Sequence, residues 1–238
     1  MYKRILLKLS GEALADKKQN QTLNCEKLNV IAKEIKKIHN EGVQIGIVVG
    51  AGNIWRGKFA EQIGIERAEA DYMGMIGTII NSVALASALK NIGVDSEVMS
   101  AIDVEPVTNP YNIKTAIEKL EKGVVLVFGG GTGKPYFTTD TAATMRAIEI
   151  GADVILMGKY GVDGIYDSDP KVNPTAKLIK DITFDEILAK KLKVMDLTAV
   201  ELIKDKNIDI RVFNMDDPDN IEKATLDNEI GTTARKGK

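Results

Sequence analysis

The stretch Val124–Asp140, VVLVFGGGTGKPYFTTD, combines the features that decide the fold of this chain. An apolar run that is typical of a buried strand ends at Phe128, and four glycines follow it. Glycines leave backbone N–H groups open to a ligand, and the helix-like run from Thr141 adds the positive end of a helix dipole. A strand, a glycine loop and a helix start in this order predict a site for a phosphate or a nucleotide.

The two common phosphate-loop motifs do not fit this stretch. A Walker A loop requires Gly-x-x-x-x-Gly-Lys-Ser/Thr, but Gly133–Lys134 is followed by Pro135. A dinucleotide fingerprint requires a third glycine at the position where Lys134 stands. A second glycine loop, Gly50–Asn53, fails the same test because Trp55 occupies its third glycine position. The chain therefore has phosphate-loop chemistry outside both common motifs.

Composition limits the class of protein. The chain has 238 residues, 44% of them hydrophobic, and a formal net charge of −2. This balance argues against nucleic-acid binding, which needs a basic surface. Cys25 is the single cysteine, which excludes a disulfide within one chain and fits a reducing cytoplasm. No apolar run reaches the ~18 residues of a membrane span, and His39 is expected to be a solvated surface residue.

Apolar runs alternate with helical patterns along the chain. Short continuous apolar runs, typical of strands buried on both faces, cover Ile5–Leu9, Gln44–Val49, Ser96–Met99, Val124–Phe128, Val154–Met157 and Ile210–Phe213. Helical spacing marks Glu26–Glu41, Met73–Ile92, Lys114–Glu121, Thr141–Ile150 and Leu197–Lys206. The alternation predicts an α/β fold with a parallel-rich sheet covered on both faces. Ligands bind such sheets at the carboxyl ends of the strands, which both glycine loops follow.

Local signals refine the ends of these elements. Gly42 is expected to close the first helix, and Asp71 to open and cap the long apolar one. The run Met73–Ile92 is apolar nearly all round, which predicts burial on more than one side. The tail Gly231–Lys238 is polar and is expected to be frayed.

Polar side chains cluster around the expected strand ends. Lys8 and Ser10 end the first strand, and Arg56 follows the Gly50 loop. Thr138 and Thr139 add hydroxyl donors, and Asp140 places a carboxylate at the start of a helix. Each feature alone reads as an ordinary turn or a solvated side chain. Several phosphate-suited loops at successive strand ends are much harder to explain by structure alone.

Seven strings of residues together resemble the amino acid kinase family over nearly the whole chain. They are YKRILLKLSGEAL at Tyr2–Leu14, GxGNxxRG at Gly50–Gly57, DYMGMIGTIIN at Asp71–Asn81, GTGKPYFTTDTAA at Gly131–Ala143, VDGIYDSDP at Val162–Pro170, KVMDLTA at Lys193–Ala199 and IRVFNM at Ile210–Met215. The strings GTGxPxFTTD and KVMDL are specific to the branch whose acceptor is uridine monophosphate (UMP). Kinases of carboxylates and carbamate share the glycine loops but not these strings.

The resemblance implies a single domain over residues 1–238, folded as a three-layer αβα sandwich with a mainly parallel central sheet. Its N-terminal part would hold the phosphate acceptor and its C-terminal part ATP. The implied reaction transfers the γ-phosphoryl of ATP to UMP, giving UDP and ADP for pyrimidine nucleotide biosynthesis. Relatives are typically hexameric and magnesium-dependent, with GTP as activator and UTP as inhibitor. We expect Mg²⁺ to be carried with ATP, because no carboxylate cluster resembles a metal cage.

The likeness also implies which residues bind each nucleotide. The ATP site would comprise Lys8, Leu9, Ser10, Gly11, Gly52, Arg56, Tyr160, Tyr166 and Asp169. The UMP site would comprise Ala51, Asp71, Thr132, Gly133, Lys134, Pro135, Tyr136, Phe137, Thr138 and Thr139. The residue chemistry agrees with such a transfer, since Lys8 and Arg56 can neutralise charge on the transferring oxygens. Asp140 would orient Lys8 and complete the catalytic set.

Three positions depart from the pattern of the relatives. Ala51 replaces the middle glycine of the second loop, and the backbone contact survives if its φ is negative. The segment Asp16–Gln21 replaces a Gly-Phe-Gly stretch, which predicts a weak or absent response to GTP. Tyr160 or Gly161 stands where relatives often have an asparagine.

Two rival functions remain open at this point. One is a kinase of a small carboxylate or carbamate in the same superfamily, which the string PYFTTD disfavours. The other is a nucleotide-binding regulatory module without catalysis, which the presence of Lys8, Arg56 and Asp140 disfavours.

Overall fold

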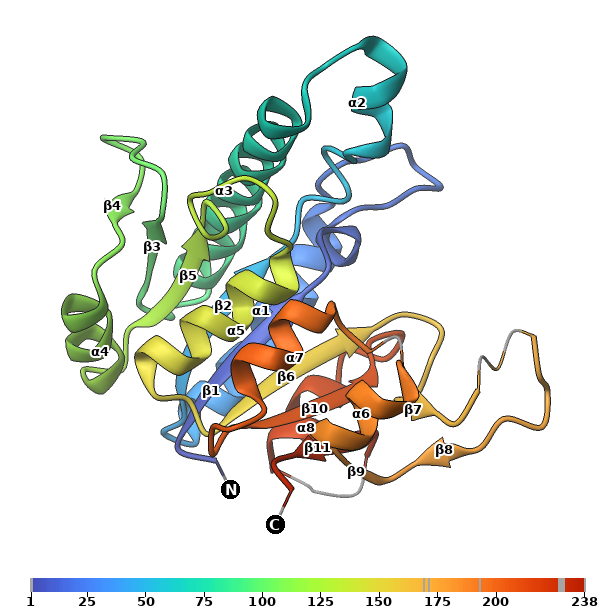
Figure 1. The fold of residues 1–238 in the computed structure, drawn as a ribbon. Coiled ribbons are helices and arrows are strands. Elements are labelled where there is room, and N and C mark those ends of the chain that lie inside the picture. The colour runs from blue at the N-terminus through green and yellow to red at the C-terminus, as the bar shows by residue number, and fades with distance from the viewer. Residues whose placement is uncertain (1, 169, 171, 193, 227–229, 238) are drawn as a thin grey trace.

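A nine-stranded sheet runs through the middle of the molecule (Figure 1). The computed structural model describes residues 2–168, 170, 172–192, 194–226 and 230–237. Within these residues the strand order is β4-β3-β5-β2-β1-β6-β10-β11-β9. The strands are β1 Arg4–Leu9, β2 Gln44–Val49, β3 Ser96–Ser100, β4 Asn109–Pro110, β5 Val125–Gly129, β6 Val154–Lys159, β9 Asp181–Thr183, β10 Asp209–Asn214 and β11 Thr232–Arg235. Only β9 and β11 run against the others, so the described sheet is mainly parallel, as predicted.

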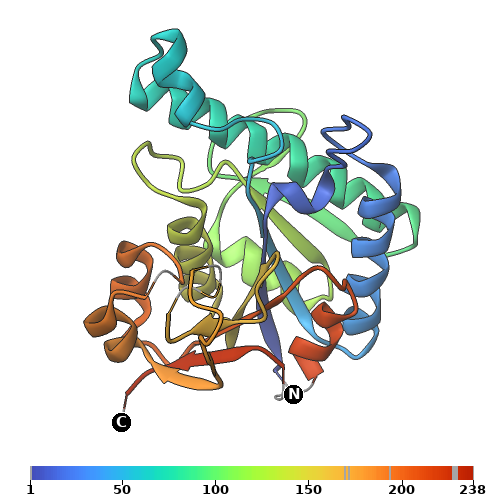
Figure 2. The same cartoon turned by 90° about the vertical axis from the view of Figure 1, so that its right-hand side faces the viewer.

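Helices cover both faces of the sheet and make three layers (Figure 2). On one face lie α1 Cys25–Asn40, α3 Arg67–Asn91 and α8 Asn220–Leu226. On the other lie α4 Ile113–Glu121, α5 Thr139–Ile150, α6 Phe184–Lys190 and α7 Leu197–Ile203. The short helices η1 Gly11–Leu14 and α2 Lys58–Ile63 follow strand ends, and β7 Ile165–Tyr166 pairs with β8 Leu178–Ile179 in a separate hairpin. The predicted αβα sandwich is confirmed.

Strand β1 shows why the predicted strands are continuous apolar runs. Ile5, Leu7 and Leu9 belong to the core beneath α1 and α3, whereas Leu6 belongs to the core beneath α5. All four side chains are fully buried. Successive side chains of a strand point to opposite faces, and here both faces are covered by helices. Each such burial contributes about 1.5–3 kcal/mol, so both layers hold the strand in place.

The start of α3 differs from the prediction. Asp71 does not open this helix, because Glu66 is its N-cap and the helix begins at Arg67. Helix-favouring residues, among them Ala68 and Ala70, extend it by one turn before Asp71. The Asp71 carboxylate instead accepts the backbone N–H of Tyr136 at 2.8 Å. The expected closing glycine of α1, Gly42, does adopt a left-handed φ of 81° just beyond the helix end.

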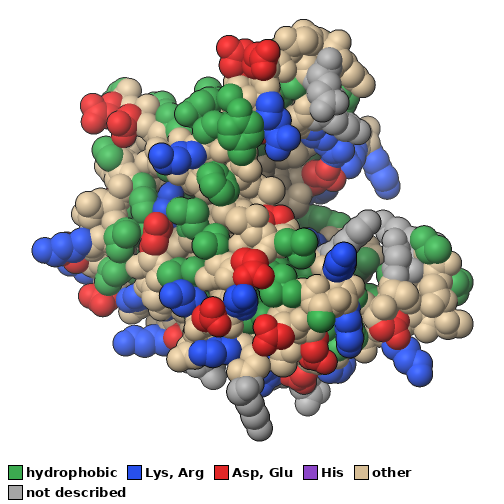
Figure 3. Space-filling view, in the orientation of Figure 1, with side chains coloured by type: hydrophobic (Ala, Val, Ile, Leu, Met, Phe, Trp, Pro, Cys, Tyr) green, Lys and Arg blue, Asp and Glu red, His purple; other side chains and the backbone are tan. Residues whose placement is uncertain are grey.

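Helix α3 presents one apolar side to the sheet and another to the surface. Its length and hydropathy would suit a membrane span, but 56% of its most apolar window is buried inside the protein. Ile79 packs inward with 4% exposure, whereas Ile76 and Ile80 are 51% and 47% exposed. Hydrophobic side chains gather over the upper part of this helix in Figure 3. The predicted burial on more than one side is therefore not achieved within the described part of one chain.

Two sequence expectations about surface segments are wrong. The tail is not frayed throughout, because Thr232, Thr233 and Ala234 form β11 and are almost fully buried. β-Branched threonines suit a strand, and β11 gains hydrogen bonds from β10 on one side and β9 on the other. His39 is half-buried rather than solvated, and its Nε2 lies 2.7 Å from the Gly123 carbonyl oxygen.

Candidate active site

The carboxyl end of β1 places a lysine beside the start of helix α5. The Nζ of Lys8 forms an ion pair with the Asp140 carboxylate at 2.8 Å, and both side chains are largely buried. Asp140 stands in the first turn because Thr138 caps the helix, its hydroxyl accepting the N–H groups of Asp140 and Thr141 at 3.1 and 3.2 Å. The helix therefore begins two residues before the predicted Thr141. The expected contact between Lys8 and Asp140 is present.

The two N-terminal loops pack backbone against backbone. A Cβ on Gly11 would lie 2.2 Å from the Asn53 amide oxygen and 2.3 Å from the Gly50 carbonyl, so only glycine fits there. Asn81, fully buried on α3, donates to the Gly50 carbonyl and to the Asn53 side chain, both at 2.8 Å. The φ of Ala51 is not positive, which is the condition for its backbone N–H to keep the predicted ligand contact. The Gly50 loop is thus fixed by a buried asparagine that residue patterns alone did not single out.

Buried side chains also hold the glycine loop after β5. The Thr78 hydroxyl accepts the Gly130 N–H at 2.9 Å, and Arg146 donates to the Gly131 carbonyl at 3.3 Å. Arg146 is 4% exposed, pairs with Glu149, and stacks over the Tyr111 ring at 3.7 Å.

Burial and the Glu149 hydrogen bond together raise the pKa of Tyr111. The hydroxyl of Tyr111 therefore stays protonated and donates to Glu149 at 2.6 Å. Through Arg146, this cluster holds the carbonyl of Gly131 in the glycine loop.

A cavity of about 290 Å³ lies between the two glycine loops and the start of α3. Seven of the predicted UMP residues line it: Ala51, Asp71, Thr132, Lys134, Phe137, Thr138 and Thr139. Gly133, Pro135 and Tyr136 are not among its lining residues, and Tyr136 is 65% exposed. Trp55, Met75 and Thr78 line it as well, although residue reasoning did not propose them. We call this space the acceptor cavity, after the predicted UMP residues that line it.

A second cavity, of about 430 Å³, opens beside the β7–β8 hairpin. Its lining includes Lys159, Tyr166, Lys191 and apolar side chains such as Leu192 and Val212. Of the predicted ATP-site residues, Tyr166 lies here, and Tyr160 is not among the lining residues. Asp169 falls outside the described residues. We call this space the donor cavity, after Tyr166, the predicted ATP-site residue that lines it.

The Lys8–Asp140 pair adjoins residues of both cavities. Thr139, the neighbour of Asp140, lines the acceptor cavity, and Lys159 lines the donor cavity. Burial lowers the pKa of Lys159, and the positive charge of Lys8 lowers it further, against the opposing effect of Asp140. Two lysines and one carboxylate therefore share a small region at the ends of β1 and β6. Lys159 was missed because a lysine after a strand usually reads as solvated.

Asp196 is a further residue that sequence reasoning did not assign to the site. It belongs to the KVMDL string, and its carboxylate accepts the hydroxyls of Thr138 and Thr141, the latter at 3.1 Å. It also caps α7 through the Ala199 N–H at 2.9 Å. Because Thr138 is occupied as a helix cap and by Asp196, its hydroxyl is less free to donate to a phosphate than predicted.

Arg56 faces a third, smaller space. It lines a cavity of about 270 Å³ together with the segment that follows η1. Its guanidinium forms an ion pair with Glu12, and its Nε–H donates to the Gly52 carbonyl at 3.1 Å. Gly52 lines the acceptor cavity too, so Arg56 stands at the edge of that cavity.

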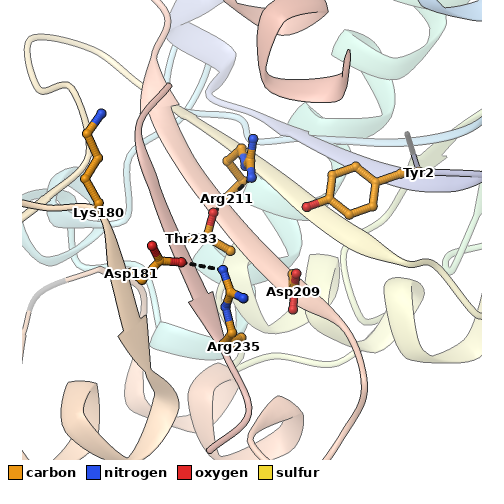
Figure 4. A pocket seen from close by; sticks show the side chains of 7 residues that line it. All are labelled: Tyr2, Lys180, Asp181, Asp209, Arg211, Thr233 and Arg235. Carbon is orange, nitrogen blue, oxygen red and sulfur yellow. Dashed lines mark hydrogen bonds and ion pairs between the residues drawn. The ribbon is translucent and has the colours of Figure 1, made fainter. Parts of the chain in front are cut away.

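A further cavity lies away from these loops. Figure 4 shows its lining residues, which are Tyr2, Lys180, Asp181, Asp209, Arg211, Thr233 and Arg235. Asp209 begins β10 and Tyr2 precedes β1, so the cavity lies near the amino ends of those strands. Burial raises the pKa of Asp209, against the opposing charges of Arg235 and Arg211. Ligands of parallel sheets bind at the other edge, so this cavity is not the candidate site.

Known proteins resemble this chain over nearly its full length. The family model described as the amino acid kinase family matches residues 3–214. A curated uridylate kinase of Pediococcus pentosaceus is 47% identical over 234 residues, 98% of this chain and 97% of the relative.

Solved structures agree with these sequence comparisons. The UMP kinase of Bacillus anthracis superimposes with a TM-score of 0.95 at 41% identity, covering 100% of this chain and 97% of the other. The UMP kinase of Ureaplasma parvum gives 0.93 at 41% identity, covering 99% and 100%. The range matched by the family model contains both glycine loops, Lys8 and Asp140. The chain belongs to the amino acid kinase family.

Proposed function

We propose that this protein transfers the γ-phosphoryl group of ATP to UMP, giving UDP and ADP in pyrimidine nucleotide biosynthesis. The names of its relatives support the substrates. One structural observation carries the proposal for the site. The Lys8–Asp140 ion pair adjoins residues of two cavities, Thr139 in the one bounded by glycine loops and Lys159 in the one beside the β7–β8 hairpin. A phosphoryl group passing from a donor to an acceptor would cross this point.

The proposed chemistry needs charge stabilisation more than covalent catalysis. Phosphoryl transfer depends mainly on positioning and on neutralising the equatorial oxygens. Lys8 and Arg56 supply positive charge to those oxygens. Asp140 orients Lys8 rather than acting as a strong base, because a phosphate acceptor is already nucleophilic. The backbone N–H groups of Ser10 and Gly11 would bind ATP phosphates at the end of β1.

Each nucleotide has its own half of the site in this proposal. In the acceptor cavity, Asp71 would accept from ribose hydroxyls, with Thr132 and Thr139 near the phosphate. In the donor cavity, Tyr166 would contact the nucleoside and Lys159 the phosphates. The described residues contain no group of three or more His, Cys, Asp or Glu side chains that would hold a metal. In this proposal magnesium arrives with ATP, held by phosphate oxygens and water.

A coupled assay of ADP release tests the function against its rivals. UMP, CMP, aspartate, acetylglutamate and carbamate would be offered as acceptors with ATP. UMP should be phosphorylated far better than CMP or any carboxylate. Comparable turnover of CMP and UMP would contradict the uridylate assignment. ATP binding without turnover of any acceptor would favour the non-catalytic module.

The exposed face of α3 supports a proposal about assembly. Ile76 and Ile80 face outward on a helix whose other side packs on the sheet. An exposed apolar patch of this kind marks a protein interface. Closed symmetric association of six subunits into a cytoplasmic homohexamer would cover it. Ile80→Glu should split the assembly in light scattering, whereas Ile79, which points inward, is the wrong position for such a test. A monomeric parent protein at micromolar concentration would refute this proposal.

The acceptor cavity and the segment after η1 also suggest how nucleotides would regulate the enzyme. UTP should inhibit, because it can reuse the acceptor cavity. GTP should activate weakly or not at all, since Asp16–Gln21 replaces the glycines of the relatives. Strong activation by GTP in steady-state assays would show that those glycines are dispensable.

A further inference from the structure

Glu12 lies between the two loops to which the proposed function assigns phosphate. It stands in the first turn of η1, where the Ser10 hydroxyl accepts its backbone N–H at 3.3 Å. Its side chain crosses to the neighbouring loop and pairs with the Arg56 guanidinium. The Arg56 Nε–H donates to the Gly52 carbonyl at 3.1 Å. The guanidinium is therefore held at two points, one on each loop.

Two contacts determine the orientation as well as the place of this group. The N–H donors of arginine form a rigid planar fork, so fixing two of them fixes the plane. The Arg56 side chain is 39% exposed, so the surrounding packing alone does not restrain it. The conformational freedom of one such side chain corresponds to about a 2–12-fold change in an equilibrium. A contact that removes this freedom before the nucleotide binds would raise the rate by a similar factor.

We propose that Glu12 is a positioning residue for phosphoryl transfer, which holds the Arg56 guanidinium in place before the nucleotide binds. Glu12 acts through Arg56 and does not itself contact the reacting atoms. The inference rests on the proposed role of Arg56 in neutralising phosphate charge. Glu12 belongs to the KLSGEAL string and would serve the site through its contact with Arg56 rather than through phosphate.

Lys17 completes the arrangement from the segment that departs from the family pattern. Its Nζ lies 2.8 Å from the Glu12 Oε2, whereas Arg56 contacts Oε1. The two cations therefore engage different oxygens of one carboxylate. The Lys17 side chain is 73% exposed, and exposed pairs of this kind contribute little. Lys17 thus helps to keep Glu12 turned toward Arg56, with a smaller effect than Glu12 has on Arg56.

Steady-state kinetics with ATP and UMP test the proposal in a double-mutant cycle. The proteins compared are the parent, Glu12→Ala, Arg56→Ala and the double variant. Glu12→Ala should lower kcat about 3–10-fold, with the KM of either nucleotide little changed, because Arg56 acts on charge in the transition state. The same change should have almost no further effect once Arg56 is alanine, since residues that act together are not additive.

Matched variants separate positioning from general damage. Glu12→Gln keeps an acceptor oxygen and should retain most of the parent kcat. Glu121→Ala removes a carboxylate that pairs with Arg4 at 3.5 Å, at the opposite end of β1, and should leave kcat unchanged. Thermal unfolding checks that each variant folds. If Glu12→Ala does not fold, Glu12→Asp takes its place in the cycle, because the shorter side chain keeps the charge without the reach.

Each outcome decides between the inference and the function on which it rests. A parent-like kcat in Glu12→Ala, with a loss in Arg56→Ala, overturns the positioning role alone. Equal losses from Glu12→Ala in both backgrounds also overturn it, because Glu12 would then act without Arg56. A parent-like kcat in Arg56→Ala overturns both the positioning role and the proposed role of Arg56. Production of UDP by the parent remains a separate test of the function.

Discussion

Two ion pairs at the ends of neighbouring strands differ mainly in their burial. The Lys8–Asp140 side chains are 13% and 17% exposed, whereas those of Arg56 and Glu12 are 39% and 32% exposed. Charges attract more strongly where water is excluded, and a buried charge left alone is costly. The more buried Lys8–Asp140 pair, here called the inner pair, should therefore matter for both stability and catalysis. The more exposed Arg56–Glu12 pair, here called the outer pair, should matter mainly for the orientation of the Arg56 side chain.

The largest expected effect is on turnover when the inner pair is broken. Lys8→Ala should lower kcat by roughly 10²–10³-fold, about the loss from removing one preorganised charge stabiliser. Steady-state assays with ATP and UMP measure it. A Lys8→Ala protein with parent-like turnover would remove Lys8 from the mechanism and erase the distinction between the two pairs.

The second-largest expected effect is a loss of folding stability. Lys8→Ala leaves the largely buried Asp140 carboxylate without its cation, which should cost about 1–3 kcal/mol of unfolding free energy. The double variant Lys8→Ala with Asp140→Asn should recover part of this loss without regaining activity. Urea unfolding followed by circular dichroism gives both values. If the single and double variants are equally stable, the inner pair is not effectively buried.

Lys159 sharpens the description of the inner region. Its lowered pKa means that the folded protein holds this proton less tightly than the unfolded chain. Stability should therefore rise with pH between the folded and unfolded pKa values, and the penalty is fully present below the folded one.

Lys159→Met removes this penalty. The variant should melt at a higher temperature than the parent near neutral pH, with lower activity, and the difference should narrow as the pH rises. Melting curves across alkaline pH test this. An unchanged melting temperature together with parent-like kcat would mean that Lys159 is an ordinary surface lysine.

The smallest effect belongs to the outer pair. Glu12→Ala should change the unfolding free energy by less than about 1 kcal/mol, because partly exposed pairs contribute little to stability. That small change should shrink further at high salt, which screens exposed charges, whereas the cost of Lys8→Ala should persist. Unfolding at low and high ionic strength compares the two directly. Equal salt dependence in both variants would show that the two ion pairs are equally accessible to solvent.

Most strands and helices can be predicted from the sequence because the residues that specify them lie within each element. The run Ile5–Leu9 and the helix before Gly42 are specified by their own residues. Strand β11 was missed because Thr232 and Thr233 are polar, and their burial depends on two distant strands. The extra first turn of α3 was missed because Asp71 resembles a helix cap.

The candidate site shows the same division. Lys8, Asp140 and most acceptor residues follow recognisable strings, and the structure brings them together. The supporting contacts of Asn81, Arg146 and Glu12 join segments that are separated in the sequence, so no local sequence pattern predicts them. The sequence therefore predicts which residues stand at the strand ends of the site. The side chains that hold those residues in place become visible only in the folded structure.

Transfer of label from γ-labelled ATP to UMP measures the proposed reaction and the role of Lys8 together. The parent protein and Lys8→Ala would be incubated with both nucleotides, and the products separated by chromatography. We expect labelled UDP from the parent and almost none from Lys8→Ala. Label appearing in a carboxylate or carbamate instead of UMP, or equal labelling of UDP by both proteins, would contradict it.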